Sequence, residues 1–130
     1  MESLKLSICI PEPIETVFHA WLDSKQHSRF TGSEAEVDPK VGGEFTAWGG
    51  YISGKTKVLE PPNRILQSWR TTEFPVDSPD SLLEILLEKI PGGTQLTLIH
   101  TEIPDGQAEM YREGWEEYYF TPMQDYFQQC

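Results

Sequence analysis

Two polar side chains lie inside apolar stretches of the sequence, where a binding site or a catalyst would need them. Gln67 and His100 both occupy positions that alternate with apolar residues, which predicts that they point toward a covered face. Isolated polar groups on an apolar wall fix the orientation of a small ligand. A histidine there can also transfer protons near neutral pH. The alternative is that both side chains belong to an ordinary packed core. Gln67 would then form hydrogen bonds with the backbone or water, and His100 would form one with a neighbouring tyrosine.

A complete catalytic or metal-binding constellation is not evident. The three histidines, His19, His27 and His100, fall on different predicted elements. Glu15 and His19 are four residues apart on one helical face, but no second histidine follows at metal-ligand spacing. The sequence carries no nucleophile elbow, phosphate-binding glycine loop or paired-cysteine motif. We therefore predict no catalytic residue, no metal and no cofactor.

Periodicity predicts the elements that must position these residues. A strand from Leu4 to Ile10 precedes two short helices, and a long helix over Tyr111 to Tyr126, kinked or broken at Pro122, follows the last strand. Between them the alternation predicts strands over Ala35–Val37, Glu44–Trp48, Tyr51–Leu59, Ile65–Thr71, Leu82–Ile90 and Thr94–Ile103. This order indicates an α+β fold with one antiparallel sheet, covered on one face by the last helix.

The predicted strands present three matched sets of residues to that helix. These sets are Ile65, Gln67 and Trp69; Leu83, Ile85 and Leu87; and Leu96, Leu98 and His100. The Trp48-Gly49-Gly50-Tyr51 segment reads as a hairpin turn. Its exposed side could be a ligand entrance, a dimer contact or an ordinary hairpin.

The charge composition of the chain limits the classes of molecule that it is expected to bind. The 130 residues, one domain's worth of chain over 1–130, hold ten Lys and Arg against 21 Asp and Glu, a net charge of −11. That charge argues against nucleic acid and anionic membrane as partners. No signal peptide or spanning apolar run is visible, so we expect a cytoplasmic protein. Cys9 and Cys130 could form a disulfide, but two reduced thiols are the favoured interpretation.

Five short stretches in order carry a family resemblance. They are Pro13 to Trp21, Val41 to Phe45, Gly54 with Leu59 to Ile65 and Trp69, Gly93 to His100, and Gly114-Trp115. The chain resembles, over essentially its whole length, the activator of Hsp90 ATPase homologue 1-like (AHSA1-like) family of the START/Bet v 1-like (SRPBCC) superfamily. The resemblance implies a helix-grip fold, in which a curved antiparallel sheet wraps around a long C-terminal helix. In that superfamily the space between them often holds an apolar small molecule.

The resemblance also implies a role beside an Hsp90-type chaperone. Eukaryotic Hsp90 activators carry this domain behind a separate N-terminal domain, whereas this chain begins at its first predicted strand. We therefore expect that the chaperone role does not carry over intact.

The leading hypothesis is a non-catalytic domain that binds a small apolar or aromatic ligand between the sheet and the C-terminal helix. The predicted ligand-binding residues are Trp48, Gln67, Trp69, Ile85, Leu98, His100, Trp115 and Tyr119. The alternative is that the aromatic residues of this set fill the core and bind no ligand. A stress-related co-factor of an Hsp90-type chaperone, and an enzyme that acts on an apolar substrate through His100, remain the alternative functions.

Overall fold

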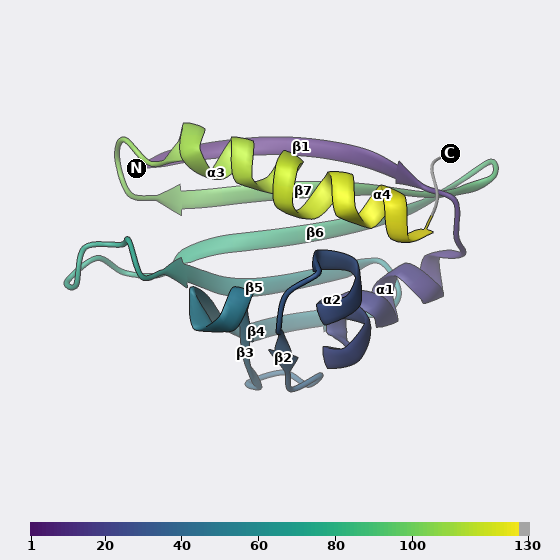
Figure 1. Ribbon diagram of the computed structural model, residues 1–130, viewed down its shortest axis with the longest axis horizontal. Coiled ribbons are helices and arrows are strands. Elements are labelled where there is room, and N and C mark those ends of the chain that lie inside the picture. Colours follow the sequence, from purple (N-terminus) through teal and green to yellow (C-terminus); the bar gives the residue numbers. More distant parts are fainter. Residues whose placement is uncertain (128–130) are drawn as a thin grey trace.

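Seven strands form one antiparallel sheet in the computed structural model, which describes residues 1–127 (Figure 1). The strands are β1 (Glu2–Ile10), β2 (Glu36–Val37), β3 (Glu44–Ala47), β4 (Ile52–Glu60), β5 (Arg64–Thr71), β6 (Ser81–Ile90) and β7 (Gly93–Ile103). Their order across the sheet is β1-β7-β6-β5-β4-β3-β2. The first strand therefore pairs with the last, and every other neighbour follows in sequence.

Helices cover one face of this sheet. Helices α1 (Ile14–Leu22) and α2 (Ser24–Thr31) follow β1, and the chain ends in a rod that comprises α3 (Ala108–Gly114), η2 (Trp115–Phe120) and α4 (Thr121–Phe127). In Figure 1 this rod runs along the strands, from the α3 label to the α4 label. Helix α2 packs against α4, and α1 packs against β6 and β7. The helix-grip arrangement expected from the resemblance is confirmed.

The spacing of buried residues explains the irregular centre of the terminal rod. Five buried side chains recur every four residues: Tyr111, Trp115, Tyr119, Met123 and Phe127. Four residues overshoot one α-helical turn by about 40°, so four such steps would rotate the last residue by about 160° from the first. The central segment η2 is a wider π-helical turn, which ends with the Thr121 N–H bonded to the Glu116 carbonyl. The wide turn takes back part of that rotation and keeps all five residues on the covered side.

The helix does not break at Pro122, so that form of the prediction is wrong. The rod continues to Phe127, and Pro122 is the second residue of α4. Proline lacks an N–H and is tolerated in the first turn of a helix. Because the π turn has already shifted the hydrogen-bonding pattern, Pro122 falls where a new α segment begins. The irregularity therefore takes the form of a wide turn before the proline.

Strand register confirms the predicted inner face of the sheet. Ile85 on β6 pairs with Ile65 on β5 and with Leu98 on β7. Leu83 pairs with both Gln67 and His100 in the same way. All nine residues of the three predicted sets are buried. Period-two alternation therefore identifies the covered face correctly.

Strands β3 and β4 form the predicted hairpin, since Ala47 pairs with Ile52 across the turn, but the turn differs from a simple two-residue one. Strand β3 ends at Ala47, one residue before the prediction, and a single helical turn, η1 (Trp48–Gly50), joins it to β4. Trp48, Gly49 and Gly50 all have positive φ, at 55°, 65° and 94°. A tryptophan rarely adopts this left-handed backbone conformation. It leaves the Trp48 side chain outside the sheet's alternation.

An acidic side chain near the N-terminus fixes the start of the terminal rod. Glu2 Oε1 accepts hydrogen bonds from the backbone N–H groups of Gly106 at 3.1 Å and Ala108 at 3.0 Å. The first N–H groups of a helix have no partner within it, and they favour a negative charge. Glu2 therefore caps α3 from β1, a contact across more than a hundred residues of sequence.

The described residues bear on two expectations from the sequence, the state of the cysteines and the absence of a membrane-spanning segment. Cys9 lies on β1, but the question of its pairing turns on Cys130, which lies outside residues 1–127. Among the residues that the structure describes, no helix is both long and apolar enough to cross a membrane.

Candidate functional site

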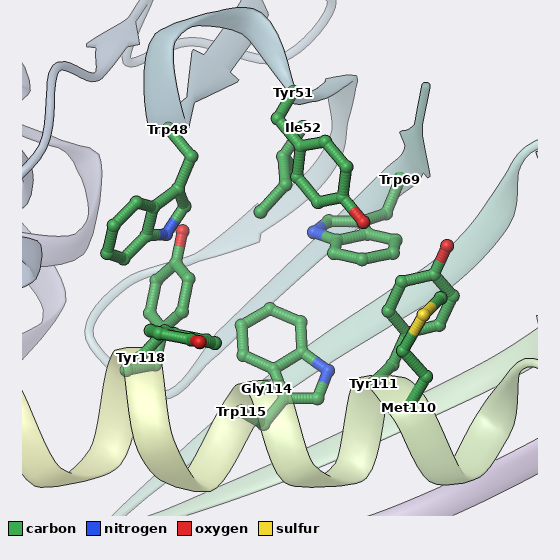
Figure 2. A pocket seen from close by; sticks show the side chains of 10 residues that line it. Trp48, Tyr51, Ile52, Trp69, Met110, Tyr111, Gly114, Trp115 and Tyr118 are labelled. Carbon is green, nitrogen blue, oxygen red and sulfur yellow. The ribbon is translucent and has the colours of Figure 1, made fainter. Parts of the chain in front are cut away.

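A cavity of about 380 Å³ lies where the terminal rod approaches the β3–β4 connection (Figure 2). Its lining comprises Trp48, Tyr51, Ile52, Trp69, Met110, Tyr111, Gly114, Trp115, Tyr118 and Tyr119. Seven of these ten residues are aromatic, and none carries a formal charge. At the mouth, Met110 is 41% exposed and Tyr118 is 52% exposed, so solvent reaches the cavity from the helix side.

The terminal rod supplies the floor. Tyr111, Trp115 and Tyr118 follow one another at intervals of four and three residues, which is the spacing that places side chains on one helical face, and Gly114 precedes Trp115. Figure 2 shows the Tyr111, Trp115 and Tyr118 side chains rising from the helix toward the strands. Gly114 leaves a gap between them, since a Cβ atom built there would meet nothing closer than Tyr118 Cδ2 at 4.0 Å.

The sheet and its β3–β4 connection supply the opposite wall. Trp48 and Tyr51 come from that connection, Ile52 begins β4, and Trp69 lies on β5. In Figure 2 their side chains point toward the helix, with Trp69 deepest. The Trp48 and Tyr118 rings meet edge to face with centroids 5.6 Å apart, which brings the two walls together at one end.

A buried hydrogen-bond chain fixes Trp115 from behind. The Trp115 indole N–H donates to His100 Nδ1 at 3.1 Å, and His100 Nε2 lies 2.8 Å from Ser81 Oγ. Ser81 donates its one hydroxyl proton to the Trp69 carbonyl at 2.7 Å. His100 Nε2 must therefore carry the ring proton and donate it to Ser81, which makes His100 neutral. Burial agrees with this, since it lowers the pKa of His100 to about 3.

A second buried histidine fixes Tyr119. His27 Nδ1 lies 2.8 Å from the Trp21 carbonyl, which can only accept, so Nδ1 carries the proton. His27 Nε2 then accepts the hydrogen bond of the Tyr119 hydroxyl at 3.0 Å. Burial lowers the pKa of His27 to about 4 and raises the pKa of Tyr119. Helices α1 and α2 thereby hold the end of the cavity formed by η2.

Two further tyrosines of the lining, Tyr111 and Tyr51, form hydrogen bonds at the other end of the cavity. Tyr111 donates to Gln107 Oε1 at 2.8 Å and accepts from Thr71 Oγ1 at 2.6 Å. Tyr51 donates to the Glu73 carboxylate, and burial raises its pKa to about 12. Four of the polar atoms on the cavity wall, those of Trp115, Tyr119, Tyr111 and Tyr51, are thus committed to protein partners.

The structure divides the eight predicted ligand-binding residues into two groups. Trp48, Trp69, Trp115 and Tyr119 line the cavity. Gln67, Ile85, Leu98 and His100 lie behind it in the packed core and do not line it. Gln67 is occupied by partners, since its carbonyl accepts from the Trp21 indole at 3.2 Å and its amide donates to Thr56 at 3.1 Å.

Six lining residues were not among the predicted set: Tyr51, Ile52, Met110, Tyr111, Gly114 and Tyr118. Tyr111 and Tyr118 share the helical face of Trp115 and Tyr119, so the spacing on the helix could have found them. Tyr51 adjoins the double glycine beside Trp48. Ile52, Met110 and Gly114 carry no signal of their own in the sequence.

The chemical groups that the cavity offers are mainly aromatic rings. His100 has no ring nitrogen left for a substrate and does not reach the cavity. Within residues 1–127, no three His, Cys, Asp or Glu side chains gather in a way that could hold a metal ion. The cavity offers ring faces and edges, and its size falls within the range of roughly 300–1,000 Å³ that is typical of small-molecule sites.

Comparisons with known proteins agree with this fold. A profile of the family described as "Activator of Hsp90 ATPase homolog 1-like protein" matches residues 11–128. The activator of 90 kDa heat shock protein ATPase homolog 1 of Homo sapiens is 26% identical over 113 residues, which is 87% of this chain and 33% of that protein. The corresponding activator of Dictyostelium discoideum is 31% identical over 90 residues, or 67% of this chain and 23% of that protein. The chain thus spans about a third or less of the length of these curated relatives.

Solved structures extend the likeness over nearly the whole chain. An HSP90 activator from Plasmodium falciparum superposes with a TM-score of 0.89 at 26% identity, and the match covers 97% of this chain and 96% of that one. The CalU16 protein of Micromonospora echinospora superposes with a TM-score of 0.81, also at 26% identity, over 97% of this chain and 76% of that one.

Proposed function

This chain belongs to the activator of Hsp90 ATPase homologue 1-like family, and we propose that it binds a small apolar or aromatic molecule between its sheet and its C-terminal helix. The observation that carries this proposal is the aromatic cavity of about 380 Å³. The ligand would lie between Trp115 on one side and Trp69 and Tyr51 on the other, and would enter past Met110 and Tyr118.

The ring arrangement supports an open rather than a collapsed cavity. Trp115, Tyr119 and Tyr111 each have a hydrogen-bonded polar atom, and each of those bonds ties the ring to a different element. Closing the cavity would require these rings to move, and the buried partners would lose their bonds. A buried polar group left without a partner costs about 1–3 kcal/mol. The network therefore acts against collapse of the walls.

A titration followed by amide chemical shifts tests the proposal. We expect some members of a panel of small neutral aromatic compounds to cause saturable shifts. The shifts should cluster on the β3–β4 connection, on Trp69 and on residues 110–119. The Trp48, Trp69 and Trp115 indole N–H signals provide three reporters inside the site. Saturable shifts confined to other surfaces, or none with any compound, would overturn the proposal.

A chaperone-directed role is the second candidate, and it rests on a specific observation. The structural match that covers 96% of its own chain is described as an HSP90 activator. We propose on that basis that this chain contacts an Hsp90-type chaperone. The test is the ATPase rate of a purified Hsp90 with and without this protein, together with a binding measurement. A change in rate or a saturable complex would support the role, and the absence of both would refute it.

A further inference from the structure

We propose that the ligand of the aromatic cavity is an organic cation, a quaternary ammonium group attached to an apolar body. This inference rests on the proposed function, because it names the class of molecule that the same cavity takes. It comes from the kind of side chain that lines the cavity, from the polar atoms that are already occupied, and from the charge of the surroundings.

The wall is aromatic where the rest of the inner face is aliphatic. Trp48, Trp69 and Trp115 line the cavity together with Tyr51, Tyr111, Tyr118 and Tyr119, and Ile52 is the one branched aliphatic residue among the ten. The neighbouring inner face of the sheet is built from Ile65, Leu83, Ile85, Leu96 and Leu98. An aliphatic wall would accept a neutral apolar ligand equally well. Ring faces also attract a cation, and tryptophan provides the strongest such attraction.

The hydrogen-bonding state of the wall favours an ammonium that carries no N–H. The Tyr51 hydroxyl is bonded to Glu73, and the Tyr119 hydroxyl is bonded to His27. The Tyr111 hydroxyl is bonded to both Thr71 and Gln107. A primary amine would bring three N–H donors to a wall whose only side-chain oxygen acceptors are tyrosine hydroxyls, and each donor left unpaired would be penalised. A quaternary ammonium presents only methyl groups and requires no acceptor.

Charge supports a cation and disfavours an anion. No Lys, Arg or His is among the ten lining residues. The carboxylate of Glu73 holds the Tyr51 hydroxyl at one end of the cavity. The whole chain carries a net charge of −11, which raises the local concentration of cations near its surface. An anionic ligand would find neither a partner in the cavity nor attraction on the way to it.

A matched pair of probes tests this inference. Phenyltrimethylammonium and tert-butylbenzene have nearly the same shape and differ in that a cationic nitrogen replaces a carbon atom. Both are titrated into the protein, with the Trp48, Trp69 and Trp115 indole signals as the readout. We expect the cation to bind about tenfold or more tightly than the neutral isostere. The affinity of a cation held by ring faces in a partly enclosed site should change little between about 50 mM and about 300 mM salt, whereas simple attraction to an acidic surface would be screened.

A substitution assigns the preference to the ring faces. Trp48→Leu keeps an apolar side chain on the β3–β4 connection but removes one face, so it should weaken binding of the cation about tenfold and binding of the isostere about threefold or less. Tyr126→Leu is the matched control, because Tyr126 is a partly exposed aromatic residue of α4 that does not line the cavity. It should leave both affinities unchanged.

The outcomes separate this inference from the proposed function. Equal or tighter binding of tert-butylbenzene in the cavity would overturn the cation preference and leave the proposed function standing. A cation preference that vanishes with salt, or that Trp48→Leu leaves intact, would also overturn the inference. If neither probe nor any neutral aromatic compound shifts the indole signals, the proposed function fails and the inference fails with it.

Discussion

The space between the sheet and the helices has two regions that differ in packing: one is filled by side chains and the other contains a cavity. In the first, Ile65, Ile85 and Leu98 lie directly side by side on β5, β6 and β7, and each is completely buried. In the second, Trp69 and the β3–β4 connection lie opposite Trp115 and the tyrosines of the rod, and a cavity of about 380 Å³ remains between them.

The difference lies in what constrains each side chain. Aliphatic side chains carry no polar atom, so they can adopt whichever rotamers fill the space. The indole of Trp115 and the hydroxyl of Tyr119 are instead fixed by His100 and His27, neutral acceptors buried behind the wall. We conclude that the polar network holds flat rings apart, and that this is what keeps one region open while the other closes.

The largest expected effect is a truncation in the packed region. Leu98→Ala should lower the free energy of unfolding by about 2–5 kcal/mol, because it leaves a void in a close-packed layer. Tyr118→Ala, at the exposed mouth of the cavity, should cost less than about 1.5 kcal/mol. Chemical denaturation of both variants measures the difference. Equal losses would contradict the contrast between a packed and an open region.

Acidification should act on the polar network. The folded state holds His100 and His27 neutral, with pKa values of about 3 and about 4, whereas the unfolded chain protonates both near 6.5. Because the folded pKa values are lowered, this contribution to stability is complete above pH 6.5 and decreases as the pH falls below it. Each histidine contributes at most about 1.4 kcal/mol per pH unit, so the pair should lower the free energy of unfolding by about 3–4 kcal/mol between pH 7 and pH 5.

Denaturation curves at pH 7, 6 and 5 measure this slope, in a range that lies above the titration of ordinary carboxylates. About half of the expected slope would show that one of the two histidines is charged in the folded protein over that range, and a flat profile would show that both are. The hydrogen-bond assignment behind Trp115 and Tyr119 would then be incorrect.

Removal of the remote helix cap should have a smaller effect. Glu2→Ala leaves the N–H groups of Gly106 and Ala108 without their carboxylate acceptor, and should cost about 1 kcal/mol. Hydrogen exchange should show increased opening of α3, which carries Met110 and Tyr111 of the cavity wall. Glu109→Ala is the control, because Glu109 lies in the same first turn but has only a long 3.7 Å contact with Arg112. Equal effects of the two changes would rule out a specific cap.

The smallest effect, with the opposite sign, is expected at Gly114. Gly114→Ala adds one methyl group into open space inside a helix, so it should raise the free energy of unfolding by about 0.5–1 kcal/mol. Thermal or chemical unfolding of the wild-type and Gly114→Ala proteins measures this change in stability. A loss of stability would mean that the space beside Gly114 is already filled.

The sequence predicts the packed region better than the open one. Alternation along β5, β6 and β7 is enough to identify the covered face, because the side-chain period of a strand is two. It cannot say which covered residues line a cavity. Gln67 and His100 are correctly placed on that face, but their partners come from Trp21 and Trp115, which are distant in sequence. A polar residue that lines the cavity and a polar residue buried behind the cavity wall give the same alternation in the sequence.

Two further features depend on contacts that no local pattern encodes. The Glu2 cap joins the first strand to the last helix, and the left-handed Trp48 departs from its residue preference. The wide turn in the terminal rod is different, since buried residues every four positions from Tyr111 to Phe127 are visible in the sequence. A spacing of four sustained over that length is incompatible with a straight α-helix that buries all five.

Calorimetric titration of the best-binding aromatic compound into wild-type, Gly114→Ala and Gly114→Leu proteins tests the central claim most directly. Leucine at position 114 would project into the cavity, whereas alanine occupies only the space beside the helix. We expect that Gly114→Leu folds and abolishes binding, while Gly114→Ala binds within a few-fold of wild type. Undiminished binding to folded Gly114→Leu would place the ligand elsewhere and contradict the assignment of the open region as the site.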